Sequence, residues 1–340
     1  MVPMSRRPFE RNGQKLTVPL DATPPLALST SGLTKSYGTR TAVSDLNLAI
    51  PRGVISGFVG PNGAGKTTTI RMLLGLIAPT AGSGQVLGAD LGQPQHFLHR
   101  VGAMIESPAF YPTLSGQKNL GVLARLGGIP QVNTDRALHR VGLADRATDT
   151  FRSYSLGMKQ RLGIAAALLP DPDLLILDEP TNGLDPAGIA EMRVLFRSLA
   201  DDGITIFVSS HLLSEIAQIC KHLVVISSGR MVFQGHIGDL MNRTQPLLRA
   251  TPELLGQLES LEHLATGLGM VTQLEHGSLV AHGDSRDAAR LFRAAARADI
   301  TLVQLDVLRP SLEDTFLALT SDGDVPTSDP GASALEGTRG

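Results

Sequence analysis

A short glycine-rich stretch, GPNGAGKTT at residues 60–68, constrains the fold of this chain more than any other feature. Its spacing is that of a phosphate-binding loop: Gly60, four residues, then Gly65, Lys66 and Thr67. The apolar run GVISGFVG before it predicts a buried strand, and TTIRMLLGLI after it predicts a helix. Because a strand, a glycine-rich turn and a helix follow one another, the sequence predicts a nucleotide site in an α/β domain.

The residue types of this loop suit the phosphates of a nucleoside triphosphate. Glycines let the backbone curl so that successive N–H groups meet phosphate oxygens, and the N-terminus of the following helix adds partial positive charge. We expect Lys66 to reach the β- and γ-phosphates and the Thr67 hydroxyl to coordinate Mg²⁺. The loop residues expected to contact the nucleotide are Gly60, Pro61, Asn62, Gly63, Ala64, Gly65, Lys66, Thr67 and Thr68.

The stretch LLILDEP supplies two acids at the end of an apolar run. Asp178 ends a predicted buried strand, where a carboxylate is tolerated if it holds Mg²⁺ directly or through water. Glu179 points elsewhere and is a candidate to polarise the water that attacks the γ-phosphate. Taken alone, the pair could be a solvated strand end, but beside a phosphate loop it predicts the metal and water side of one site.

The stretch SYSLGMKQR, residues 153–161, predicts a second anion site. Ser155 and Gly157 stand at the front of a helical run, so a hydroxyl and a helix N-terminus face the same way. By itself this pattern is also that of a helix capped by a serine. Its place ahead of Asp178 in the chain favours the anion site.

Together with NGLDP and VSSH, these stretches resemble the ATP-binding-cassette family in order and spacing across roughly residues 27–237. SLGM departs from the commonest signature of that family, LSGGQ, but keeps its serine and its second glycine. The resemblance implies a P-loop ATPase in which two such domains enclose two ATP molecules with Mg²⁺. Each ATP then lies between the phosphate loop of one copy and Ser155 and Gly157 of the other.

The resemblance implies roles for three further residues. Tyr37 matches the aromatic residue that stacks on adenine, although it could be an ordinary turn tyrosine. Asp185 matches an aspartate at the dimer interface, and its place ahead of Pro186 also predicts a helix N-cap. His211 follows the run ITIFVSS and matches a switch histidine that contacts the γ-phosphate, where a structural histidine is the alternative.

In MIESPAFYP, an apolar run ends in a lone carboxylate, Glu106. The family usually has a glutamine there, reaching toward Mg²⁺ and the attacking water, so the resemblance implies that Glu106 faces the metal. A carboxylate brings a full negative charge where the amide would bring a neutral acceptor. Phe110 and Tyr111 fall where the family meets its membrane partner, and core aromatics are the alternative.

The rest of the chain divides by composition. Residues 1–26 and 321–340 are rich in small, proline and polar residues and predict disordered tails. Between them, apolar strands alternate with helices over 27–240 and predict the α/β ATP-binding domain, with an inserted helical subdomain at about 113–169. Residues 241–320 predict a small α+β accessory domain for packing or dimerisation, without a catalytic constellation. In this domain MVTQLEHGSLVAHG predicts a hairpin that turns near His276-Gly277, and SLEDTFLALT, residues 311–320, predicts a last helix.

Composition also excludes several partners. Thirty basic and 32 acidic residues nearly balance, so we expect no nucleic acid partner. A single cysteine, Cys220, excludes an intramolecular disulfide, and no window approaches 18 consecutive apolar residues, the length needed to cross a membrane. This predicts a cytoplasmic protein that does not itself span a membrane, and the family resemblance implies that it docks on a separate membrane permease.

The variants IESPAFYP and YSLGMKQRLGIA and the late stretch PSLEDTFLAL resemble one branch of the family. They are similar to ATPase subunits of two-component exporters for bacitracin, lantibiotics and anthracyclines. The resemblance implies a homodimer, peripheral on the cytoplasmic face of the membrane, that powers a permease exporting an antibiotic, peptide or drug. The alternative is a cassette ATPase of iron–sulfur assembly, translation or DNA repair that is not coupled to transport.

Overall fold

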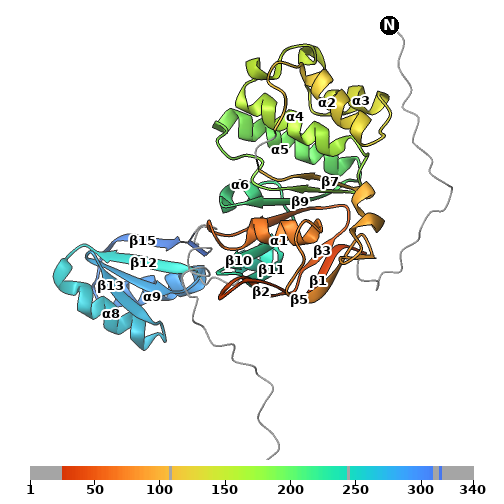
Figure 1. The fold of residues 1–340 in the computed structure, drawn as a ribbon. Coiled ribbons are helices and arrows are strands. Elements are labelled where there is room, and N and C mark those ends of the chain that lie inside the picture. Colours follow the sequence, from red (N-terminus) through yellow and green to blue (C-terminus); the bar gives the residue numbers. More distant parts are fainter. Residues whose placement is uncertain (1–24, 107–108, 243–245, 309–313, 316–340) are drawn as a thin grey trace, which may run out of the picture.

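A six-stranded sheet forms the centre of the molecule in the computed structural model, which describes residues 25–106, 109–242, 246–308 and 314–315 (Figure 1). The strand order is β11-β10-β4-β9-β8-β7, parallel except for β11, which runs antiparallel to β10. The strands are β4 (Ile55–Val59), β7 (Val101–Met104), β8 (Leu174–Leu177), β9 (Thr205–Ser210), β10 (His222–Ser227) and β11 (Arg230–His236).

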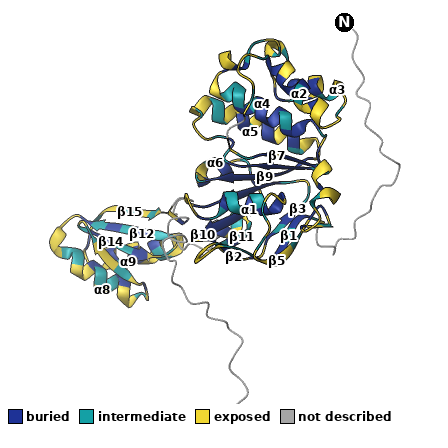
Figure 2. Cartoon of the chain, viewed as in Figure 1, coloured by how far each residue is buried: buried dark blue, intermediate teal, exposed yellow. Residues whose placement is uncertain are grey.

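The central strands are apolar on both sides because each side meets a different core. In β8, Leu174 and Ile176 belong to one core, and Leu175 and Leu177 belong to the other. All residues of β4, β8 and β9 are buried, as the dark blue strands of Figure 2 show. The buried strands expected from the sequence are therefore confirmed. The helices of this domain are α1 (Lys66–Leu73), α5 (Pro186–Asp201), α6 (Leu213–Ala217) and α7 (Ile237–Asn242).

An antiparallel sheet covers the α1 side of the central sheet, and sequence analysis did not predict it. Its order is β2-β1-β5-β6, with β3 also paired to β1. The segment between β3 and β5 contains β4, the phosphate loop and α1, so the pairing is not local. The strands are β1 (Leu26–Tyr37), β2 (Arg40–Leu46), β3 (Ala49–Pro51), β5 (Ala81–Val86) and β6 (Ala89–Asp90).

Three helices form a unit on the other side of the central sheet, at the top of Figure 1. They are α2 (Gly116–Leu126), α3 (Val132–Arg140) and α4 (Leu156–Leu168). Ser115 caps α2 by accepting a hydrogen bond from the backbone of Lys118, and α4 packs on β7, where a Cβ at Gly102 would lie 2.1 Å from the carbonyl oxygen of Ala167. Short 3-10 turns lie at Pro94–His96, Leu98–Arg100, Ala144–Arg146, Phe151–Ser153 and Leu255–Gln257.

The C-terminal part of the chain folds around a core of its own, to the left in Figure 1. Its elements follow the order βαββαβ, and its sheet has the order β13-β14-β12-β15 with antiparallel neighbours. This is the split βαβ arrangement of ferredoxin-like folds. The elements are β12 (Leu247–Pro252), α8 (Leu258–Gly267), β13 (Thr272–Glu275), β14 (Ser278–His282), α9 (Ser285–Arg297) and β15 (Leu302–Leu308).

Local chemistry explains the turns of this part. His276 and Gly277 both have positive φ, 48° and 81°, so the hairpin expected at that dipeptide is confirmed. Asp284 and Asp287 form a capping box at the start of α9. The helix expected at 311–320 lies outside the described residues, except for residues 314 and 315. Both expected tails also lie outside them, except for residues 25 and 26, and Leu26 is the first residue of β1.

No helix among the residues described by the structure is both long and apolar enough to cross a membrane.

Candidate nucleotide site

The phosphate loop joins β4 to α1, and its backbone is held tightly from behind. A Cβ at Gly60 would lie 2.3 Å from the carbonyl oxygen of Ile226, and one at Gly65 would lie 2.6 Å from that of Ala42. Gly65 also has a φ of 103°, which favours glycine. The turn after β10 adds a hydrogen bond from the Gly229 N–H to the Ala64 carbonyl, at 3.0 Å. The glycine spacing thus follows from backbone packing as well as from ligand contact.

Lys66 begins α1 with its side chain buried, at 6% exposure. Its ammonium Nζ donates a hydrogen bond to the Gly60 carbonyl at 2.7 Å and lies 3.2 Å from Oε1 of Glu179. A buried ammonium is costly unless it is paired, and here a carbonyl and a carboxylate satisfy it. The cation expected to meet phosphates is therefore held at the loop by a carboxylate that follows β8, two strands away from β4 in the sheet.

Asp178 directly follows β8 and is buried, at 5% exposure. Its Oδ2 accepts a hydrogen bond from the Thr67 hydroxyl at 2.7 Å, and its Oδ1 accepts one from the Ser209 hydroxyl at 2.5 Å. Within the described part of the chain no three His, Cys, Asp or Glu side chains gather into a metal cluster. A hydroxyl and one carboxylate fit Mg²⁺, which takes few protein oxygens and keeps water and phosphate oxygens.

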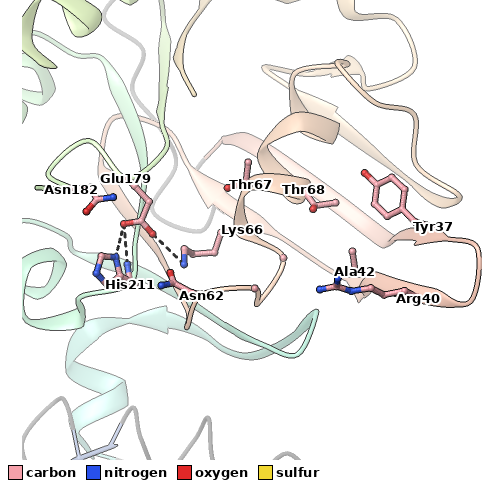
Figure 3. A pocket seen from close by; sticks show the side chains of 12 residues that line it. Tyr37, Arg40, Ala42, Asn62, Lys66, Thr67, Thr68, Glu179, Asn182 and His211 are labelled. Carbon is pink, nitrogen blue, oxygen red and sulfur yellow. Dashed lines mark hydrogen bonds and ion pairs between the residues drawn. The ribbon is translucent and has the colours of Figure 1, made fainter. Parts of the chain in front are cut away.

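Glu179 is bound on both of its carboxylate oxygens, as Figure 3 shows. Oε1 faces Lys66, and Oε2 lies 2.8 Å from Nδ1 of His211 and accepts the His211 backbone N–H at 3.3 Å. The backbone of Glu179 has a φ of 49° and donates its N–H to the Ser209 hydroxyl at 3.0 Å. Three expected residues, Lys66, Glu179 and His211, thus meet in one network.

Ser209 is the member of this network that sequence reasoning missed. Its hydroxyl is buried between Asp178 and the backbone of Glu179, and so it links the two acids. The signal was present in the stretch VSSH, where a polar residue interrupts an apolar strand two positions before His211. Because β8 and β9 are parallel neighbours, the ends of both strands meet at one edge of the sheet.

A cavity of about 570 Å³ lies beside Lys66, Glu179 and His211. In Figure 3, Glu179 and His211 lie at one end of it and Tyr37 and Arg40 lie at the other. The Tyr37 ring is 52% exposed, with Nζ of Lys35 5.2 Å from its centroid. The cavity is lined by Tyr37, Arg40, Ala42, Asn62, Gly63, Gly65, Lys66, Thr67, Thr68, Glu179, Asn182 and His211.

A second cavity, of about 510 Å³, shares no lining residue with the first. Ser155 caps α4 by accepting a hydrogen bond from the Met158 N–H at 3.2 Å, and Asp185 caps α5 by accepting one from the Gly188 N–H at 2.8 Å. Both N-cap interpretations are therefore confirmed. Gly157 also lines this cavity, so Ser155, Gly157 and Asp185 lie together and apart from Lys66.

Glu106 does not line the first cavity. It follows β7 with a φ of 64°, its side chain is 66% exposed, and its carboxylate pairs with the guanidinium of Arg71 on α1. The structure therefore brings Thr67 and Asp178 together but leaves Glu106 facing Arg71. The strand end itself is close to the site, because the Met104 carbonyl accepts the Asp178 N–H at 2.8 Å.

A phosphate loop, an acid pair and a separate serine-capped helix on this fold define an ATP-binding protein of the cassette type. The family model described as ABC transporter matches residues 43–182. Together with the relatives described next, this shows that the chain belongs to the ABC transporter family, as an ATPase subunit. The resemblance found in the sequence is thereby confirmed.

Two similar proteins extend over most of the chain. The bacitracin transport ATP-binding protein BcrA of Enterococcus faecalis is 39% identical over 305 residues, covering 88% of this chain and 97% of that protein. The daunorubicin resistance ATP-binding protein DrrA3 of Streptomyces coeruleorubidus is 34% identical over 308 residues, covering 87% and 96%. A solved structure of an ATP-binding subunit of an ABC transporter is 28% identical, with a TM-score of 0.57, and covers 64% of this chain and 93% of its own.

Proposed function

We propose that this chain is the ATP-hydrolysing subunit of a two-component exporter and powers a separate membrane permease that exports an antibiotic, peptide or drug-like substrate. The observation that carries the proposal is the network of Lys66, Glu179 and His211 beside the phosphate loop. The names of BcrA and DrrA3, which match nearly the whole chain, support the exporter class.

Each residue of the site has a role in this proposal. Lys66 neutralises the β- and γ-phosphates, and the backbone N–H groups of the loop orient them. Thr67 and Asp178 hold Mg²⁺, which supplies charge neutralisation of the phosphate oxygens when bound. Glu179 accepts a proton from the attacking water, and His211 keeps that carboxylate aimed toward the γ-phosphate. Tyr37 stacks on the adenine at the opposite end of the cavity.

The second cavity belongs to the ATP of another copy in this proposal. Ser155 and Gly157 present a hydroxyl and a helix N-terminus, which suit phosphate oxygens, and Asp185 lies beside them. Because the two cavities share no lining residue, two copies arranged head to tail complete two sites. ATP binding then favours the closed pair through its higher affinity for that state, and hydrolysis reopens it.

The membrane partner is proposed to dock near the end of β7. Tyr111 is 62% exposed there, while Phe110 packs edge-on against Phe151 at 5.2 Å between ring centroids. One aromatic is thus available to a partner and the other anchors the segment to the helical unit. In the chain, Glu106 stands between this segment and the end of β7, where the Met104 carbonyl accepts the Asp178 N–H, and this order suits a role in coupling the two.

Glu179→Gln tests the assignment of the base. Loss of the proton acceptor should lower steady-state phosphate release by at least about a hundredfold, while ATP stays bound to the protein through gel filtration. Glu259→Gln, the same exchange on an exposed turn of α8, is the matched control and should hydrolyse ATP normally. Normal turnover in the Glu179→Gln variant would show that another group activates the water.

Membrane fractionation tests the exporter proposal separately. The chain should sediment with membranes only when its permease is expressed, because no described helix crosses a membrane. Copurification with ribosomes or scaffold proteins, with no membrane association under any condition, would favour a cassette ATPase that is not coupled to transport.

A further inference from the structure

Arg40 lines the nucleotide cavity beside Tyr37, and the proposed mechanism gives it no role. It is the first residue of β2, and in the hairpin with β1 it stands directly opposite Tyr37. The two residues between them are Gly38, with a φ of 58°, and Thr39, and glycine at the first position suits a tight hairpin turn. Because opposed residues of an antiparallel pair place their side chains on one face, this turn fixes Arg40 beside Tyr37.

The Arg40 guanidinium is not engaged by the protein. In the part of the chain that the structure describes, its side chain takes part in no hydrogen bond and no ion pair. Lys35, on the same strand as Tyr37, differs, because its Nζ donates to the Ala78 carbonyl at 2.6 Å and it does not line the cavity. Unpaired arginines are common on protein surfaces, so the free guanidinium is informative only because it lines a cavity.

The charge of the cavity leaves room for a second cation. Lys66, the other cation among the described lining residues, is paired with Glu179 at 3.2 Å. Every phosphate of a nucleoside triphosphate is negatively charged, and the side chain of Lys66 is suited to the β- and γ-phosphates. The α-phosphate, which lies between these and the base, is then left without a cationic side chain.

The direction of the Arg40 side chain fits this gap. In Figure 3 it extends from the Tyr37 end of the cavity toward the phosphate loop. A base stacked on Tyr37 and a γ-phosphate at Lys66 place the α-phosphate in the part of the cavity between them. A guanidinium presents a planar fork of N–H donors, which matches two oxygens of one phosphate.

We propose that Arg40 binds the α-phosphate of the nucleotide. The inference rests on the proposed assignment of this cavity to ATP, and it adds a binding residue that acts independently of the γ-phosphate contacts. Because ADP keeps the α-phosphate, Arg40 contributes to the affinity for the product as well as for the substrate. Arg40 therefore affects how tightly nucleotide is held, whereas Glu179 affects how fast it is hydrolysed.

The base is the other part of a nucleotide that an arginine beside Tyr37 could contact. Arginine on a base edge favours guanine, whose O6 and N7 accept two hydrogen bonds from one guanidinium. The α-phosphate is common to adenine and guanine nucleotides, so a phosphate contact does not discriminate between them. The two assignments therefore predict different effects of an Arg40 substitution on the ratio of ADP to GDP affinity.

Calorimetric titration of the full-length chain with ADP and with GDP tests the assignment without hydrolysis. Arg40→Gln should weaken the binding of both nucleotides by about tenfold, because a charge-assisted hydrogen bond is lost. Arg40→Lys keeps the charge but not the fork, and should weaken binding by only about threefold. Unchanged ADP affinity in Arg40→Gln, a changed ratio of ADP to GDP affinity, or equal losses in the two variants would each overturn the proposal.

Kinetics give a second measurement with the same variants. Arg40→Gln should raise the KM for ATP by about tenfold and leave kcat within about twofold, because the reacting atoms lie at the other end of the cavity. Its thermal unfolding midpoint should equal that of the wild type. Arg286→Gln, at an exposed position of α9, is the matched control and should change neither constant. A lower kcat with an unchanged KM would contradict a binding role.

The two measurements separate this inference from the proposed function. A wild-type chain that binds ADP but does not hydrolyse ATP would refute the proposed ATPase, and the effect of Arg40→Gln on ADP affinity would still decide the role of Arg40. Normal hydrolysis together with unchanged ADP affinity in Arg40→Gln would refute the Arg40 contact alone.

Discussion

At the scale of single residues, Glu179 is under two different constraints. Its carboxylate is fixed by Lys66 and His211, which keeps it in place but also occupies both of its oxygens. A proton acceptor must have an oxygen within hydrogen-bond reach of the water. In the proposed mechanism a nucleotide would compete for Lys66 at the loop, and binding of the γ-phosphate would draw the ammonium away from Glu179. One carboxylate oxygen of the proposed base would then become available to the water.

Glu106 stands where the family resemblance implies a glutamine. Glu106→Gln keeps an oxygen acceptor at the position, so ATP hydrolysis should stay within a few-fold of wild type. Glu106→Ala should leave hydrolysis by the isolated subunit in place but reduce its stimulation by the permease, because the carboxylate that precedes the proposed docking segment is lost. The comparison of isolated and permease-stimulated phosphate release measures this.

Unchanged permease-stimulated turnover in Glu106→Ala would show that the carboxylate is only a partner of Arg71 on the surface. Arg71→Ala serves as the control for that outcome, since it removes the ion pair and keeps the carboxylate. Exposed ion pairs contribute little stability, so both variants should fold normally.

At the scale of elements, the pattern of the sequence predicted those strands and helices whose signals are local. The runs GVISGFVG, DLLILDEP and ITIFVSS are apolar at every position because each strand meets two cores, and this is visible in one dimension. The antiparallel sheet was missed because β1 pairs with β5 across the phosphate loop and α1. Such pairing depends on tertiary contacts that no short window contains.

The residues of the candidate site likewise fall into those that local motifs predict and those that depend on tertiary contacts. Lys66, Thr67, Asp178 and Glu179 follow from motifs, since each stands next to a recognisable strand or helix end. Ser209 and the Arg71–Glu106 pair could not be found, because they depend on how separate elements approach each other. The final placement of Glu106 was also beyond the sequence: a positive φ of 64° turns its side chain toward α1.

The packing of α4 on β7 allows a test at this scale. Gly102→Ala would place a methyl group 2.1 Å from the Ala167 carbonyl oxygen, which is backbone and cannot rotate away. We expect a loss of about 2 kcal/mol in the free energy of unfolding, measured by urea denaturation. Gly267→Ala at the end of α8 meets no atom within 4 Å and is the control. Equal stability of the two variants would show that α4 and β7 adjust at no cost.

At the scale of the whole molecule, the two cavities lie apart. The phosphate loop lines one of them and the Ser155 helix lines the other, and no residue lines both. In our proposal a complete nucleotide site therefore requires a second copy of the chain.

Mixed dimers test the sharing of sites. Lys66→Ala disables the loop, and Gly157→Asp sets a negative charge in the second cavity, where the nearest atom to the new Cβ is 3.9 Å away, so the fold is preserved. Each variant alone should be inactive. Mixed dimers isolated with two affinity tags contain one intact shared site and should recover up to about half of the wild-type rate.

If both halves of the site came from the same chain, the mixed dimers would stay as inactive as the parent variants. A mixture of Lys66→Ala with a Glu179→Gln variant is the negative control, since both changes fall in the first cavity and one loop-side defect remains at each site.

The close packing behind the phosphate loop has a thermodynamic consequence. Ile226, Ala42 and the turn at Gly229 fix the backbone of the loop before any ligand arrives. The loop therefore gives up little conformational freedom when it encloses a phosphate, and the ordering cost that weakens many flexible binding loops is small here. The packing that stabilises the folded sheet therefore also lowers the free-energy cost of binding the triphosphate. A substitution that stabilises this packing should also tighten nucleotide binding.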